Sequence, residues 1–305
     1  FSRRQHRRNC GRFIPALTVL FLNSRAQGQS ALFTDMDRGY WDARSKVTSW
    51  PGGDQFSSFP DADAKLSRVT PNIRGREGVV NGATFDRGVV SGNWFTIFGE
   101  DLAPDTRTWA GADSVGDALP QALDGVSVTV DGKPAFVYYI SPGQINAQAP
   151  AGLTPGWKRV EVSRNGIESN GVMTHVVNNA PGAITYSVGG RTFAVAANAA
   201  NAVLGDPSVT PGTATCAPGD TIVIYCMGLG TAPAGMARPS QAPLSGVTVS
   251  IGGRAASVGF AGLVSPGLFQ INAIVPNGTG NGDQELVITS GGVRSPKGVV
   301  VFVRQ

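Results

Sequence analysis

Few side chains in this sequence could carry out covalent or acid–base chemistry. After residue 26 the chain contains one histidine, His175, and the Gly-x-Ser-x-Gly turn that would accompany a Ser-His-Asp triad does not occur near it. Glu100 and Asp101 are adjacent carboxylates, the residue type that glycosidases use in pairs. They directly follow Gly99 at the end of an apolar run, which is typical of a solvated turn. The sequence therefore predicts no catalytic residues.

Metal and cofactor sites are not predicted either. His175 is separated from Cys216 and Cys226 by 41 and 51 residues, and these spacings match no zinc site. Gly228-Leu-Gly230 begins like a dinucleotide fingerprint, but Pro233 stands where the third glycine would be needed. We expect no metal and no cofactor.

The two cysteines after residue 26 leave a pair of alternatives open. Cys216 and Cys226 could form a disulfide, which export to an oxidising compartment would permit. A bond closing such a short loop would contribute about 2–3 kcal/mol if unstrained. Alternatively, both are free, semi-buried thiols, because the direction of their side chains does not follow from the sequence.

Four amide side chains are the candidates for binding or for tethering a loop. Gln144, Asn146, Gln270 and Asn272 occupy equivalent places in two copies of Gln-Ile-Asn-Ala. On strands, these amides project from the face opposite the intervening apolar residues. They could bind a sugar or a neighbouring domain. We favour a role for Asn146 and Asn272 in holding an adjacent loop by hydrogen bonds to its backbone, because a motif present in both copies suits a requirement of the fold.

Two tryptophans offer a second candidate surface. Trp94 and Trp157 could form a platform for carbohydrate, although β-sandwiches commonly bury such rings. Trp94 precedes Phe95, so these two rings should point to opposite faces of a strand, with at least one of them buried.

The elements that position these residues are repeated. Gly-Val-Ser-Val-Thr-Val (125–130) is echoed by Gly-Val-Thr-Val-Ser-Ile (246–251), and Ser-Pro-Gly, Gln-Ile-Asn-Ala and a closing proline occur at 141–150 and at 265–276. The order is kept while the spacing drifts, as insertions in loops would cause. The offsets are 127, 121 and 126 at three matched pairs: Gly92 and Gly219, Gly125 and Gly246, and Gln144 and Gln270. We infer a duplicated unit.

Each unit is predicted to consist of short strands. Apolar and polar residues alternate in 125–130, which indicates one buried and one solvated face, and the following Asp131-Gly132 predicts a hairpin turn. The 41 glycines, 20 prolines and 15% charged residues suit many tight turns and disfavour long helices. We therefore predict an all-β fold of two tandem immunoglobulin-like β-sandwich units.

The N-terminal segment has the composition of a targeting sequence. Residues 1–26 contain six arginines and no acidic residue, and five of these arginines precede an apolar run at 13–22. Ser24 and Ala26 then stand before a plausible cleavage point. This layout predicts a signal peptide at 1–26. We expect a linker or poorly ordered region at 27–77, the first β-sandwich unit at 78–178 and the second at 179–305.

The charge and hydropathy of the remaining chain restrict its partners. Removing those six arginines changes the net charge from +4 to −2, so no basic stripe is left to bind nucleic acid. No other apolar stretch approaches 18 residues, so we expect no transmembrane span in the mature chain.

At these motifs the chain resembles the Solibacter-type C-terminal domain family of secreted acidobacterial proteins. The resemblance covers roughly residues 78–305 and departs from the family pattern at Met227, where threonine is usual, and at the two cysteines. It implies a secreted or surface-exposed accessory region with immunoglobulin-like units and supplies no substrate. The matching segments are 96–99 with Leu102, 119–120, 125–128, 141–150, 180–182, 218–225, 228–230 and 270–276.

Together these features indicate a non-catalytic secreted or cell-surface region with a structural or interaction role. Its partner would be an extracellular protein or a polysaccharide. The alternative is a carbohydrate-binding module, which exposed aromatic residues on one sheet face would favour. An enzyme with converging carboxylates in a cleft between the two units is the third hypothesis, and the fold alone does not choose among them.

Overall fold

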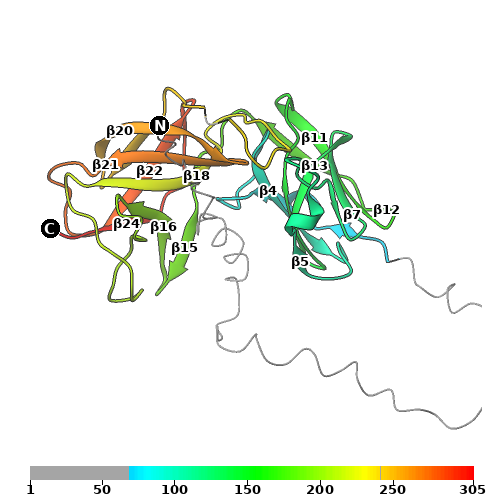
Figure 1. Cartoon of the computed structure of the whole chain (residues 1–305), viewed down its shortest axis with the longest axis horizontal. Coiled ribbons are helices and arrows are strands. Elements are labelled where there is room, and N and C mark those ends of the chain that lie inside the picture. The colour runs from blue at the N-terminus through cyan, green and yellow to red at the C-terminus, as the bar shows by residue number, and fades with distance from the viewer. Residues whose placement is uncertain (1–68, 241) are drawn as a thin grey trace, which may run out of the picture. The chain divides into compact units, whose positions relative to one another are not determined.

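The computed structural model describes residues 69–240 and 242–305 (Figure 1). The predicted signal peptide and residues 27–68 of the predicted linker lie outside the described residues. Within the described part the expected all-β fold is confirmed, because the regular elements are strands apart from two 3-10 helices, η2 (Gly75–Glu77) and η3 (Gly111–Asp113).

The strands from residue 72 to residue 177, which we call the first half, form two sheets. The first has the order β1-β4-β10-β9-β5, with β2 also paired to β4. Its strands are β1 (Asn72–Ile73), β2 (Val79–Asn81), β4 (Trp94–Glu100), β5 (Arg107–Thr108), β9 (Phe136–Ser141) and β10 (Gln144–Gln148).

The second sheet of this half has the order β3-β13-β11-β7-β6, with β12 paired to β11 and β8 to β7. Its strands are β3 (Val89–Val90), β6 (Ala122–Leu123), β7 (Val126–Val130), β8 (Lys133–Pro134), β11 (Gly156–Arg164), β12 (Ile167–Glu168) and β13 (Val172–Val177). The inner faces of the two sheets share one apolar core, as expected of a sandwich.

The strands from residue 182 to residue 303, the second half, form one continuous sheet of order β14-β18-β21-β20-β19-β22-β24-β16-β15, with β17 on β18 and β23 on β22. Its strands are β14 (Gly182–Ala183), β15 (Thr185–Val188), β16 (Arg191–Ala194), β17 (Ala196–Asn198), β18 (Thr221–Met227), β19 (Thr248–Ile251), β20 (Arg254–Ser265), β21 (Leu268–Ile274), β22 (Gly282–Ser290), β23 (Val293–Arg294) and β24 (Val299–Val303). The sheet is continuous because the start of the long strand β20 pairs with β19 and the rest of it pairs with β21.

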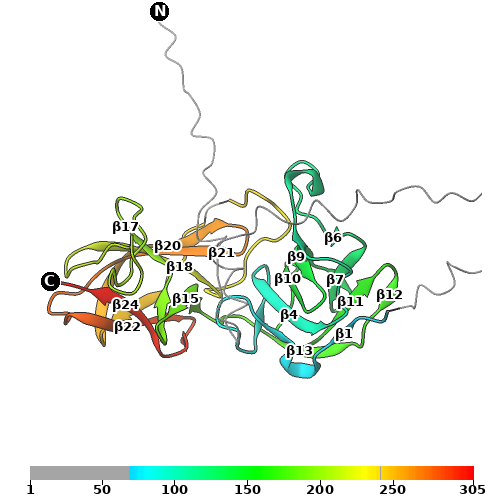
Figure 2. The same ribbon diagram turned by 90° about the horizontal axis from the view of Figure 1, so that it is seen from below.

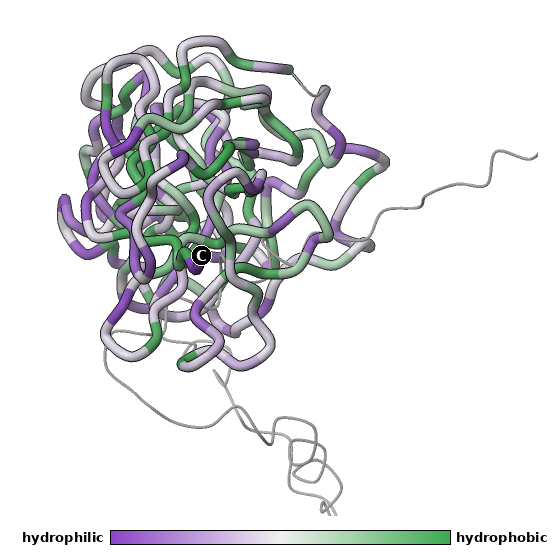
Figure 3. Tube along the Cα trace, turned by 90° about the vertical axis from the view of Figure 1, so that its left-hand side faces the viewer, coloured by the Kyte–Doolittle hydropathy of each residue, from purple (hydrophilic) through white to green (hydrophobic). Residues whose placement is uncertain are grey.

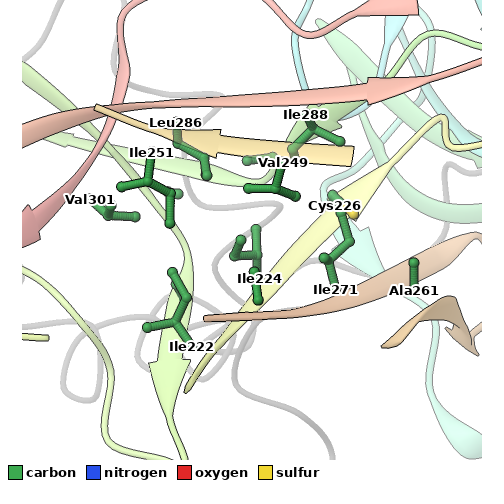
Figure 4. Close-up of a cluster of buried hydrophobic side chains, with 14 of the residues drawn as sticks. Ile222, Ile224, Cys226, Val249, Ile251, Ala261, Ile271, Leu286, Ile288 and Val301 are labelled. Atoms are coloured by element: carbon green, nitrogen blue, oxygen red, sulfur yellow. The ribbon is translucent and has the colours of Figure 1, made fainter. Parts of the chain in front are cut away.

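The core of the second half lies between the two layers that β20 connects. Figure 4 shows apolar side chains of β18, β19, β21 and β22 turned toward one another, with the Cys226 thiol among them. Hydrophobic and hydrophilic residues are interspersed along the chain (Figure 3). In β7 the expected alternation is confirmed, since Val126, Val128 and Val130 are buried and the two residues between them are half-buried.

Strand pairing repeats between the halves. β10 pairs with β4 as β21 pairs with β18, and β2 and β1 add to β4 as β17 and β14 add to β18. The parallel pair of β3 and β13 recurs as β16 and β24. Even an irregularity is shared, because the register of β9 on β10 and of β20 on β21 shifts at matching positions, at Tyr138 and at Gly259.

Strand β1 lies within the stretch 27–77 that the sequence assigned to a linker. Ile73 is buried in β1, and Asn170 clamps its backbone: the Ile73 N–H donates to Asn170 Oδ1 at 2.6 Å, and Asn170 Nδ2 donates to the Ile73 carbonyl at 2.8 Å. The sequence did not predict this two-residue strand, because it is too short to show alternation and depends on a partner 97 residues away. By their contacts residues 70–305 belong to one unit. In the first half, β10 lies between β4 and β9 (Figure 2).

Candidate functional site

The amides of the first Gln-Ile-Asn-Ala copy form a buried hydrogen-bonded row. Asn146 is 2% exposed, and its Oδ1 accepts hydrogen bonds from Thr96 Oγ1 and Gln144 Nε2, both at 2.9 Å. Ile145 and Ala147 point to the opposite, core side of β10, as the period of two predicted. These contacts satisfy polar groups within the fold, and they leave the Asn146 carbonyl oxygen engaged by two donors.

The second copy repeats half of this arrangement. Gln270 Nε2 donates to Asn272 Oδ1 at 2.7 Å, while Val223 occupies the place that Thr96 has in the first copy. Gln270 and Asn272 are half-buried rather than buried. The same pair therefore lies in a more solvated setting in the second half.

Gln148, which the sequence analysis did not single out, makes the loop contact expected of Asn146. It is 0% exposed; its Nε2 donates to the carbonyls of Gly92 (2.9 Å) and Pro233 (3.4 Å), and its Oε1 accepts from the Gly235 N–H at 3.0 Å. It thus fastens a loop of the second half to β10. The available signal was its place two residues after Asn146, where the second copy has Ile274.

Trp94 is buried, so it provides no platform. Its Nε1 donates to the Pro266 carbonyl at 2.5 Å, and its ring meets Trp109 and Tyr138 edge-on at centroid distances of 5.8 and 5.7 Å. Phe95 is also buried, within the core of the first half. The two rings point to opposite faces, as expected, and both faces are covered.

Trp157, by contrast, is 56% exposed on the outer face of β11. The His175 ring on β13 lies beside it, with ring centroids 5.2 Å apart, and the guanidinium of Arg76 lies over it, 5.6 Å from the ring centroid. Met173 on β13 is 38% exposed and stands opposite Arg159 in the register. We call these five residues (Arg76, Trp157, Arg159, Met173 and His175) the tryptophan face.

Three elements position the tryptophan face. β11 and β13 are antiparallel neighbours in which Trp157 pairs with His175, so the two rings share one side of the sheet. Valines on the other side of both strands fill the core and fix their orientation. The helix η2 packs against β13 and brings Arg76 to the edge of this face. Strands β11, β13 and β7 are labelled together in Figure 1.

The charges around the tryptophan face are partly paired. Arg159 Nη2 lies 2.7 Å from Glu161 Oε1, and Arg87 forms an ion pair with Glu77. Arg76 is exposed and takes part in no ion pair among the described residues. Its guanidinium therefore retains donors that an outside anion could use.

At the equivalent position of the second half, a guanidinium is already paired with carboxylates of the chain itself. Register equates Trp157 and His175 with Asp283 and Phe302, because Gly156 opposite Val176 corresponds to Gly282 opposite Val303. There the Arg191 guanidinium lies 5.6 Å from the Phe302 centroid and is held by two carboxylates. Arg191 Nη1 donates to Asp206 at 2.7 Å, and Arg191 Nε donates to Asp283 at 2.6 Å.

We call Arg191, Asp206 and Asp283 the Arg191 cluster. Its charges are paired with one another, so it stabilises the fold and is not an open site. Hydrogen bonds from Arg191 and then from Ser208 lower the pKa of Asp206 to about 2. Asp206, Ser208 and Phe302 also line a cleft of about 390 Å³ together with Asn281 and Arg304. The carboxylate in that cleft is already committed to Arg191 and Ser208.

Cys216 and Cys226 are free, buried thiols, which is the second of the two alternatives. Each faces a different strand: Cys216 Sγ donates to the Phe302 carbonyl at 3.4 Å, and Cys226 Sγ donates to the Phe269 carbonyl at 3.7 Å. Burial raises the pKa of Cys216 to about 11 and raises the pKa of Cys226 further. Neither thiol is poised as a nucleophile at neutral pH.

The remaining chemical candidates lie where the sequence placed them. His175 is exposed on the outer face of β13, and Glu100 and Asp101 are exposed at the end of β4, where Asp101 has a positive φ of 53°. Within residues 69–240 and 242–305 no group of three or more histidine, cysteine or acidic side chains is arranged to hold a metal ion.

No helix in the described part of the chain is long and apolar enough to cross a membrane.

Comparison with known proteins gives no family assignment. No family model and no curated protein matches the chain. Among solved structures, the Bacteroides ovatus glucan-utilization protein SGBP-B, in complex with a mixed-linkage heptasaccharide, is similar at 12% identity and a TM-score of 0.30, over 72% of this chain and 44% of that one. The plexin A4 extracellular region is similar at 13% identity and a TM-score of 0.27, over 83% and 20%. Titin domains Z1Z2 in complex with telethonin are similar at 9% identity and a TM-score of 0.19, over 77% and 97%.

Proposed function

We propose that this chain is a non-catalytic interaction region, secreted or displayed at the cell surface, that holds an external partner on the tryptophan face. The observation that carries the proposal is the exposure of Trp157 (56%) beside His175 and under Arg76. A large aromatic ring left in water on a sheet face, next to polar groups that can orient a ligand, has the composition of a binding surface.

The setting of the face supports binding rather than catalysis. Its rings and guanidinium groups can stack and donate hydrogen bonds, but the neighbouring carboxylates Glu161 and Glu77 are paired with Arg159 and Arg87. The same strands bury valines on their inner side, so the surface is held rigidly before any ligand arrives.

Export is part of the proposal and is supported by sequence features alone. The arginine-rich, apolar and small-residue order of 1–26 is that of a signal peptide. Membership in the Solibacter-type C-terminal domain family, proposed from the Gln-Ile-Asn-Ala motifs, agrees with a secreted accessory role.

A second candidate function, a carbohydrate-binding module, is favoured by one specific observation. Trp157 lies on an open sheet face rather than in a core, and an aromatic ring in that position can stack on the C–H face of a pyranose. Trp94, the other half of the platform considered from the sequence, is buried and does not contribute.

The test is binding of the mature chain, from Gln27, to an array of plant, fungal and bacterial polysaccharides. Trp157→Ala should reduce retention on every bound polymer by about tenfold or more, because the stacking surface is lost. Val115→Ala, at a site 83% exposed in the loop after η3, should change nothing. Both variants should keep the wild-type Tm, since surface substitutions change stability by only about 0.5 kcal/mol.

One outcome counts against the tryptophan face, and another counts against the carbohydrate-binding module. Retention that is equal for wild type and Trp157→Ala removes the tryptophan face from the interaction. Absence of retention on every polymer eliminates the carbohydrate-binding module and leaves a protein partner as the interaction to be sought.

A further inference from the structure

We propose that the tryptophan face binds an acidic sugar residue, a uronate, whose pyranose ring lies on Trp157 and whose carboxylate pairs with Arg76. This inference rests on the proposed function and names the class of ligand. It makes the chain a receptor for uronate-containing polysaccharide rather than for neutral polymers.

The first argument is the unmatched guanidinium. Arg76 lies 5.6 Å from the Trp157 centroid and forms no ion pair among the described residues, whereas Arg87 and Arg159 of the same half each pair with a glutamate. An arginine stacked on an aromatic ring presents its edge donors sideways, where a planar carboxylate can accept two of them.

The second argument is the internal comparison between the halves. In the second half the guanidinium over Phe302 is satisfied by Asp283, which stands at the position of Trp157, and by Asp206. In the first half the positions of Phe302 and Asp283 are held by His175 and Trp157, and Arg76 of η2 lies over Trp157 instead. Among the described residues no carboxylate is paired with Arg76, and a ligand carboxylate would provide the complementary charge.

The third argument concerns the rest of the ligand. Trp157 offers a flat apolar surface, Met173 extends it, and His175 adds a hydrogen-bonding ring beside it. A sugar acid has an apolar C–H face, hydroxyl groups and one carboxylate on a single rigid ring, so each of these groups finds a counterpart. A nucleic acid would need several unpaired basic residues to contact successive phosphates, and this face has one.

The experiment compares each ligand with its own neutral form. The mature chain is titrated by calorimetry with oligomers of galacturonate, glucuronate and mannuronate, and with the methyl ester of each, which keeps the ring and masks the carboxylate. We expect at least one acid to bind about tenfold more tightly than its ester, because a charge-assisted pair is lost in the ester. That difference should shrink as salt is raised.

Variants assign the two contacts separately. Arg76→Gln should weaken binding of the acid to the level of the ester and leave the ester unchanged, while Trp157→Ala should weaken both. Arg294→Gln, which removes an exposed arginine from β23 in the second half, is the matched control and should bind like wild type.

The results that overturn the inference differ from those that overturn the proposed function. Equal affinity for acid and ester, or no effect of Arg76→Gln, rejects the uronate while leaving a neutral saccharide on Trp157. Poly-glutamate that binds as tightly as the uronate oligomers, with the same sensitivity to both substitutions, identifies an acidic peptide as the ligand instead. No binding of any oligomer rejects the inference outright.

Discussion

Single amide side chains have different roles in the two halves although the motif around them is the same. Asn146 Oδ1 is engaged by Thr96 and Gln144 on a buried face, whereas Asn272 has only Gln270 and is partly solvated. The difference arises from one neighbour, because Val223 cannot donate the hydrogen bond that Thr96 donates. A buried acceptor with two donors contributes more than a half-exposed acceptor with one.

We therefore predict unequal costs for one substitution made at equivalent sites. Asn146→Ala should destabilise the chain by about 1–3 kcal/mol, because it leaves the Thr96 hydroxyl and the Gln144 amide buried without their acceptor. Asn272→Ala should cost about 1 kcal/mol or less, since water can replace its partner. Urea unfolding followed by circular dichroism measures both, and equal losses would show that the burial difference has no energetic weight.

At the scale of elements, the sequence predicted what local patterns control. The alternation in 125–130 predicted β7, and Asp131-Gly132 predicted its hairpin, where the structure has φ of 54° and 74°. Residues that act through distant partners could not be found this way. β1 depends on Asn170, and the position of Trp157 on an open face depends on which strands cover it. Periodicity gives the face of a strand but not what lies against that face.

Arg191 joins β16 to Asp206, in the loop between β17 and β18, and to Asp283 of β22, so the charge state of these groups affects how the three segments hold together. Arg191 lowers the pKa of Asp206 to about 2 in the folded chain, below the value of about 4 in an unfolded chain. The carboxylate thus stabilises the fold at neutral pH, and this contribution is lost as the pH falls from about 4 toward 2.

We expect Asp206→Asn to lower the Tm at pH 7 and to flatten the acid limb of the Tm profile between pH 5 and pH 2. Asp105→Asn, which changes an exposed carboxylate outside this cluster, should leave the profile of the wild type intact. The check is differential scanning calorimetry at half-unit pH steps. A profile for Asp206→Asn that runs parallel to that of wild type would contradict the assignment.

At the scale of the whole molecule, one apolar cluster contains side chains of both halves. Trp94 and Ala83 share it with Ile184, Met227 and Leu268. Polar contacts surround this cluster: Asn93 Oδ1 accepts from the Gly228 N–H at 2.9 Å, and the bonds of Gln148 reach the loop at Pro233 and Gly235. Gly92 is required there, because a Cβ at that position would collide with the Ala232 carbonyl.

These contacts predict that wild type unfolds in a single calorimetric transition. Gln148→Leu should lower its stability by about 1–3 kcal/mol and separate the transition into two, because buried partners in the second half lose their hydrogen bonds. Ile274→Leu is the control, since it alters the equivalent, 42% exposed position in the second half. Two transitions already present in wild type would show that the halves unfold independently.

Chemical labelling of the two buried thiols can measure how often the second half opens. Cys226 is enclosed in that core and Cys216 lies against Phe302 beside β24, while the described part of the first half contains no cysteine. A thiol reagent can reach them only in molecules that have transiently opened, so the labelling rate measures how often that happens. Modification at Cys216 before Cys226 would register fraying of the C-terminal strand, and simultaneous modification would register cooperative opening. From Gln27 onward the sequence thus carries its own probe of native-state fluctuations, confined to one half.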